Sequence, residues 1–125
     1  MRFARWVFLI GGIYGALVLA PPILGEPLMA RFYPPAPNHP ELYYGFFGTA
    51  LAWQGAFLII AVDPVRYRPL MLAAMFEKTV FPLAGLVLLA EGRLTVGHSL
   101  FGFSVIDAVW LVLFAVAWIR TKPAS

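Results

Sequence analysis

Four polar residues interrupt stretches of the sequence that are otherwise apolar. Gln54 lies in the second of these stretches, Glu77 and Lys78 lie together in the third, and Asp107 lies in the fourth. Carboxyl and amino groups can exchange protons or pair as ions. A charge at the bilayer centre costs roughly 2.5–3.5 kcal/mol on insertion scales, so such groups mark a functional site or are turned into a helix bundle. These four residues are therefore the candidate intramembrane polar site. The weaker members of the set are Thr49 and Ser104.

The apolar stretches that hold these residues are long enough to cross a membrane. Their approximate bounds are 6–25, 42–62, 69–90 and 99–119. Each is near the length of roughly 20 residues that crosses about 30 Å of hydrocarbon, and in lipid the backbone must satisfy its own hydrogen bonds. The sequence therefore predicts an all-α fold, a bundle of four transmembrane helices that forms a single integral membrane domain over residues 1–125.

The basic residues between the stretches predict an orientation. Six of them fall on the side of the chain ends, against two on the other side, and Lys and Arg are enriched on the cytoplasmic side of membrane proteins. The six are Arg2, Arg5, Arg66, Arg68, Arg120 and Lys122, and the two are Arg31 and Arg93. We expect both termini in the cytoplasm. The excess of Arg over Lys, with abundant Ala, Gly and Pro, favours a multi-pass protein of a bacterial inner membrane.

Depth along the helices brings the polar residues to a common layer. At about 1.5 Å per residue, Gln54 and Glu77 lie roughly 12 Å from the cytoplasmic end and Asp107 roughly 18 Å. Lys78 is one residue deeper than Glu77, so it is predicted to pair with Asp107, because a neutralised pair is the simplest way to bury both charges. Glu77 points about 100° away around the helix, and it either accepts from Gln54 or extends toward the interface. A purely structural role, in which the group holds the helices together, is the alternative.

Composition excludes several classes of protein. The chain is 62% hydrophobic and 12% charged, about half the charged fraction of a soluble domain. Its formal net charge of +3 is spread between the apolar stretches, so no nucleic-acid partner is predicted. With no cysteine there is no thiol redox chemistry. Phosphate-loop and hydrolase signatures are missing, and His39 and His98 match no ligand spacing, so we expect no cofactor and no metal.

Two rows of small residues predict close helix packing. The first apolar stretch has Gly11 and Gly15, with Gly12, Ala16 and Ala20 beside them, and the second has Gly45, Gly48, Ala52 and Gly55 or Ala56. Small residues allow helix backbones to approach closely within a membrane. We expect both rows to pack inside the bundle, and a dimer formed through one of them is the alternative.

The middle of the chain resembles a known type of membrane protein. The similarity lies in residues 43–48, with the sequence YYGFFG, in ALAWQ at 50–54, in DPVRYRPLM at 63–71, and in Glu77-Lys78. These segments are similar to those of small, functionally uncharacterised four-helix membrane proteins of bacteria, and the layout loosely resembles that of DoxX-like proteins. The resemblance implies a four-helix fold and an inner-membrane location, and it implies no activity.

Three classes of function remain open at this stage. The leading prediction is a non-enzymatic accessory or interaction protein, whose partners are the lipid bilayer and a second copy or another membrane protein. The second is a small proton-coupled transporter that uses Glu77, Lys78 and Asp107. The third is a membrane enzyme that acts on a lipid or isoprenoid, which would need acid–base groups converging on an apolar pocket.

Overall fold

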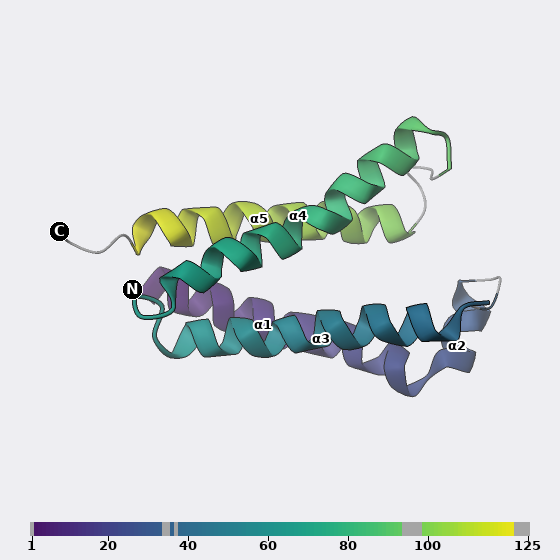
Figure 1. Ribbon diagram of the computed structural model, residues 1–125, viewed down its shortest axis with the longest axis horizontal. Coiled ribbons are helices and arrows are strands. Elements are labelled where there is room, and N and C mark those ends of the chain that lie inside the picture. The colour runs from purple at the N-terminus through teal and green to yellow at the C-terminus, as the bar shows by residue number, and fades with distance from the viewer. Residues whose placement is uncertain (1, 34–35, 37, 94–98, 122–125) are drawn as a thin grey trace.

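The computed structural model describes residues 2–33, 36, 38–93 and 99–121, and those residues form five helices (Figure 1). Four helices are long and apolar enough to cross a membrane, and the fifth is a short helix that follows the first. They are α1 (Arg2–Leu24), α2 (Glu26–Phe32), α3 (Pro40–Val62), α4 (Arg68–Ala90) and α5 (Ser99–Arg120).

The predicted all-α fold with four long apolar helices is confirmed. The long helices have 22 or 23 residues, which is roughly 33–35 Å at 1.5 Å per residue. Their bounds differ from the predicted spans by at most two residues, except that α1 begins four residues earlier. The third span is a continuous helix across Glu77 and Lys78, and it also continues through Pro82.

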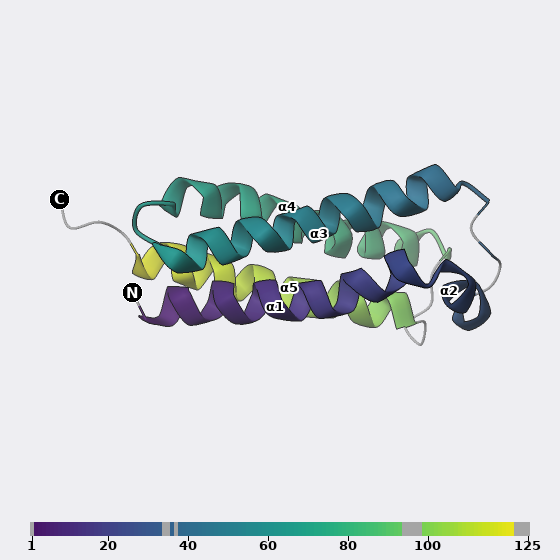
Figure 2. The same cartoon turned by 90° about the horizontal axis from the view of Figure 1, so that it is seen from below.

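The long helices are arranged as two antiparallel pairs. α1 packs along α3, α4 packs along α5, and α1 also contacts α5 (Figures 1 and 2). The turn between α3 and α4 lies at the same end as the start of α1 and the end of α5, and we call this the hairpin end. From there α3 and α4 diverge toward their other ends (Figure 1).

An aromatic core fills the half of the bundle near the hairpin end. Phe8 stacks on Phe114 with ring centroids 4.3 Å apart, and Phe57 meets Phe114 edge-on at 5.0 Å. All three rings are fully buried, and Ile60 and Met71 are buried beside them. Because aromatic pairs of this kind gain roughly 0.5–1.5 kcal/mol beyond burial, this cluster is what joins α1, α3 and α5.

The opposite end of the α1–α3 pair is joined by tyrosine hydroxyls. Tyr43 donates to the carbonyl oxygen of Pro22 at 2.6 Å, and Tyr44 donates to Glu26 Oε2 at 2.7 Å. These bonds attach the end of α1 and the start of α2 to the first turns of α3. The two helices therefore hold each other along their whole length.

The two small-residue rows have different outcomes. On α1, a Cβ added to Gly11 would lie 3.2 Å from the ring of Trp110, and one added to Gly12 would lie 2.8 Å from Leu58. On α3, a Cβ added to Gly45, Gly48 or Gly55 would have nothing within 4 Å. The prediction that both rows pack inside the bundle is therefore confirmed for α1 and wrong for α3.

Candidate functional site

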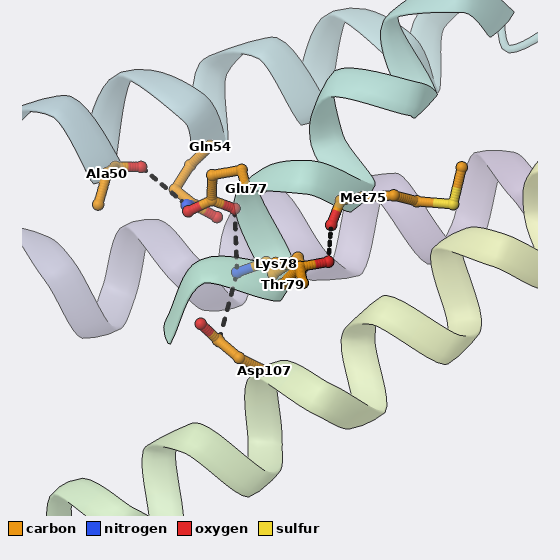
Figure 3. A network of polar contacts seen from close by, with 7 residues as sticks. All are labelled: Ala50, Gln54, Met75, Glu77, Lys78, Thr79 and Asp107. Carbon is orange, nitrogen blue, oxygen red and sulfur yellow. Dashed lines mark hydrogen bonds and ion pairs between the residues drawn. The ribbon is translucent and has the colours of Figure 1, made fainter. Parts of the chain in front are cut away.

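The structure brings the three ionisable residues of the predicted site together (Figure 3). Lys78 Nζ lies 3.4 Å from Asp107 Oδ1 and 3.8 Å from Glu77 Oε2, so one ammonium group faces two carboxyl groups. The expected contact between Lys78 and Asp107 is present, and it joins α4 to α5. We call these three residues the charged cluster.

Burial of the charged cluster follows from the way α4 sits between α3 and α5. Lys78 is 8% exposed, and its ammonium group also lies 5.4 Å from the centroid of the Phe57 ring on α3. The side chains of Glu77 and Asp107 are 20% and 24% exposed. The neighbouring Thr79 points away, and its hydroxyl donates to the Met75 carbonyl within its own helix at 2.8 Å. A buried cation held by two acids and one ring face is strongly oriented.

Gln54 approaches the cluster from α3. Its side chain and that of Glu77 overlap in the view of Figure 3. Gln54 Nε2 donates to the Ala50 carbonyl one turn earlier in its own helix, at 2.8 Å, rather than to Glu77. The other end of the amide, Oε1, lies against the Cα of Gly15 on α1. The absence of a side chain at Gly15 is what makes room for this amide.

Two buried oxygens near the cluster have no hydrogen-bond partner among the described residues. They are Gln54 Oε1 and Glu77 Oε2. Leaving a buried acceptor unpaired costs roughly 1–3 kcal/mol, and more when it is charged. The cluster also has two acids and one base, so one negative charge is left over if all three groups ionise. A fully satisfied structural network would show neither feature.

The weaker candidates separate in the structure. Ser104 is buried on α5 beside Gly85 of α4, and its hydroxyl lies 3.5 Å from the Phe81 carbonyl. Thr49 is exposed and is not part of the cluster, which corrects its placement in the polar layer. It lies five residues from Gln54, about 140° around the helix, so its depth was compatible and its direction was not.

Sequence reasoning missed two residues that shape the site. Gly15 accommodates the Gln54 amide, and the Phe57 ring lies beside the Lys78 ammonium group. Both could have been found from spacing: Phe57 is three residues from Gln54 and so shares its helix face, and Gly15 belongs to the small-residue row of α1.

The described surface has shallow hollows, and two of them lie away from the charged cluster. One follows α4 around Val80, Leu83 and Val87, and the other is formed by Thr49, Ala52, Trp53, Ala56 and Leu70. Neither is lined by Glu77, Lys78 or Asp107.

Of the two histidines considered as metal ligands, the structure describes only His39. His39 lies just before α3, exposed, with Nδ1 3.4 Å from Glu41 Oε1. His98 lies outside the described residues, as does Lys122.

Comparisons of the chain with protein-family models, with curated proteins and with solved structures found no match. Of the layout that resembles four-helix bacterial membrane proteins, the structure supports four long apolar helices. Those helices make the chain a multi-pass membrane protein in contact with the lipid bilayer.

Proposed function

We propose that this membrane protein is a non-enzymatic, proton-coupled carrier in which Glu77 takes up and releases one proton. The observation that carries the proposal is the composition of the charged cluster, where two carboxyl groups share one ammonium group inside the bundle. Because an unpaired charge within the membrane is expensive, the cluster is stable in its neutral form, which holds one proton.

Glu77 is the acid that accepts this proton. Asp107 is the closer partner of Lys78 and accepts its hydrogen bond at 3.4 Å. Glu77 is farther away at 3.8 Å, and its Oε2 has no hydrogen-bond partner among the described residues. The ion pair of Lys78 and Asp107 is therefore retained while Glu77 changes its protonation state.

Gln54 supplies the oxygen that accepts a hydrogen bond from protonated Glu77. Its Oε1 is buried and lacks a hydrogen-bond partner among the described residues. A protonated carboxyl becomes a donor, whereas an ionised one can only accept. One proton thus removes the surplus charge and turns Glu77 into a donor, which Gln54 Oε1 accepts once the amide turns away from Gly15.

The site supports a carrier better than an enzyme. A membrane enzyme that acts on a lipid needs acid–base groups beside an apolar pocket, and neither of the two hollows described above is lined by the cluster. Uptake and release of a proton at Glu77 needs no such pocket.

Infrared spectroscopy of the reconstituted protein tests the proton site directly. We expect a protonated carboxylic-acid band that disappears in Glu77→Gln and also in Asp107→Asn, because the one acid that remains in either variant ionises to pair with Lys78. Proteoliposomes with an internal pH dye then test transport, and Glu77→Gln should abolish the proton entry that the wild type shows.

The matched control is Glu91→Gln, which changes the same residue type at the exposed end of α4, where Glu91 pairs with Arg93 at 3.3 Å. It should keep both the band and the proton entry. A band that persists in Glu77→Gln would contradict the proton site. A band without proton entry would contradict the carrier and leave a proton-binding protein.

The second candidate is the accessory or interaction protein, and the row on α3 favours it. Gly45, Gly48 and Gly55 leave a strip of helix surface on which an added Cβ would meet nothing within 4 Å. Rows of this kind pack against a second helix in membranes, and a second copy is the partner that this chain itself supplies. The Gly48 substitution argued in the Discussion tests this role.

We further propose that the protein lies in a bacterial inner membrane with its termini in the cytoplasm. The support is the excess of Arg at the hairpin end, which the positive-inside rule assigns to the cytoplasm. An alkaline phosphatase fused after Arg66 should therefore be inactive, and an active fusion would contradict this topology.

A further inference from the structure

The hairpin end of the bundle concentrates positive charge. Within the described residues it carries five arginines and a single acid, Asp63, whose Oδ1 accepts the backbone N–H of Arg66 at 3.2 Å. The arginines are Arg2, Arg5, Arg66, Arg68 and Arg120. None of the ion pairs found in the described part of the chain includes one of them.

Contacts with rings and carbonyls orient these arginines without neutralising them. The Arg68 guanidinium lies 3.9 Å from the centroid of the Trp118 ring, and its Nε donates to the Trp118 carbonyl at 3.0 Å. The Arg120 guanidinium lies 4.8 Å from the Phe3 ring. Ring faces and carbonyls hold a guanidinium in place and leave its charge intact, so the end presents a fixed positive field.

Arg68 is the best placed of them to bind an anion. Only its Nε is used in a hydrogen bond among the described residues, which leaves the two Nη groups as a planar fork. Such a fork matches the oxygens of a phosphate, and stacking on Trp118 fixes its direction in advance. The cost of ordering the side chain on binding is therefore small.

The residues around the arginines fit the phosphate of a lipid. Exposed apolar side chains lie directly beside them: Ile119 is 64% exposed next to Arg120, and Leu72 is 51% exposed one turn after Arg68. A ligand that fits both features has a phosphate at the level of the helix ends and hydrocarbon alongside the helices. Basic residues at this level attract anionic lipids by about 1 kcal/mol each.

We propose that the hairpin end binds anionic phospholipids of the surrounding leaflet, with Arg68 as the residue that binds the lipid phosphate. The proposal is independent of the proton site, because none of these arginines belongs to the charged cluster.

Thermal unfolding of the full chain in nanodiscs tests it. Discs of phosphatidylcholine are compared with discs that also contain phosphatidylglycerol, and we expect the anionic lipid to raise the Tm of the wild type. Arg2→Gln with Arg66→Gln should reduce that rise, since both residues are exposed. Arg68→Lys keeps the net charge and loses the fork, and it should also reduce the rise.

The control with the same loss of charge is Arg31→Gln with Arg93→Gln, at the other end of the bundle, and it should keep the full rise in Tm. Each variant is compared with itself in the two kinds of disc, so a general loss of stability cancels. An equal reduction in the control would overturn the proposal. So would a rise in Tm produced by inorganic phosphate alone in phosphatidylcholine discs, because the ligand would then be a free anion.

Discussion

α1 and α3 lie side by side and carry similar rows of glycine, yet only the row on α1 is filled. Gly11 meets Trp110 of α5, Gly12 meets Leu58 of α3, and Gly15 meets the amide of Gln54. On α3, Gly45, Gly48 and Gly55 face away from every other described helix. A glycine row thus shows where a backbone could approach, and the arrangement of the neighbours decides whether one does.

The difference has a structural cause in the position of α1. α1 contacts both α3 and α5, so its small residues lie in the centre of the bundle, where large side chains need room. α3 has α1 as its main neighbour and diverges from α4 away from the hairpin end (Figure 1). Substitutions on the two sides should therefore differ strongly in their effect on stability.

The largest effect on stability is expected at the buried ion pair of Lys78 and Asp107. Asp107→Asn should destabilise the protein by about 3 kcal/mol, because it leaves Lys78 buried without its closer partner. Chemical unfolding in detergent micelles measures this change. Lys78→Met combined with Asp107→Leu should recover much of the loss, since no unpaired charge of that pair remains.

The outcome of that cycle separates an ion pair from two independent residues. Losses of the single variants Lys78→Met and Asp107→Leu that simply add in the double variant would show that the pair contributes no coupling energy.

The four spans and the ion pair could be predicted from the sequence because each depends only on position along the chain. Hydropathy sets which segments cross the membrane, and residue count along a helix sets the depth at which Lys78 meets Asp107. The direction of a side chain around its helix depends on which helices are neighbours, and no local pattern gives that. This is why Thr49 matches the polar layer in depth and is nevertheless exposed.

The same limit explains the remaining differences. The amide of Gln54 bonds to Ala50 of its own helix, since a carbonyl one turn away competes with any partner on another helix. The rows on α1 and α3 both repeat at three or four residues, so only the assembled bundle distinguishes the filled row from the open one.

An intermediate effect is expected where the row on α1 meets the candidate site. Gly15→Leu should destabilise the protein by about 2 kcal/mol, because a side chain there would overlap the buried Gln54 amide, and overpacking of this kind usually costs roughly 1–3 kcal/mol. Unfolding in micelles gives the loss of stability. The infrared carboxylic-acid band of Glu77 should also shift in frequency, since the displaced Gln54 can no longer accept its hydrogen bond. A band that stays unchanged while stability falls would show that Gln54 is not the acceptor.

The smallest effect on stability is expected on α3. Gly48→Leu places a side chain where an added Cβ would have nothing within 4 Å. The free energy of unfolding of the monomer should therefore change by less than about 0.5 kcal/mol. A second measurement on this variant is its monomer–dimer equilibrium in lipid, which energy transfer between labelled copies reports. If two copies pack through this row, the larger side chain separates the backbones and the dimer weakens.

Gly102→Leu is the matched control, because Gly102 is an exposed glycine of α5 that lies outside the row, and a Cβ added to it would also have nothing within 4 Å. Loss of association in Gly48→Leu alone would mean that the row on α3 is filled by a second copy. Equal association in both variants would instead leave the row facing lipid and would remove the support for an accessory role through self-association.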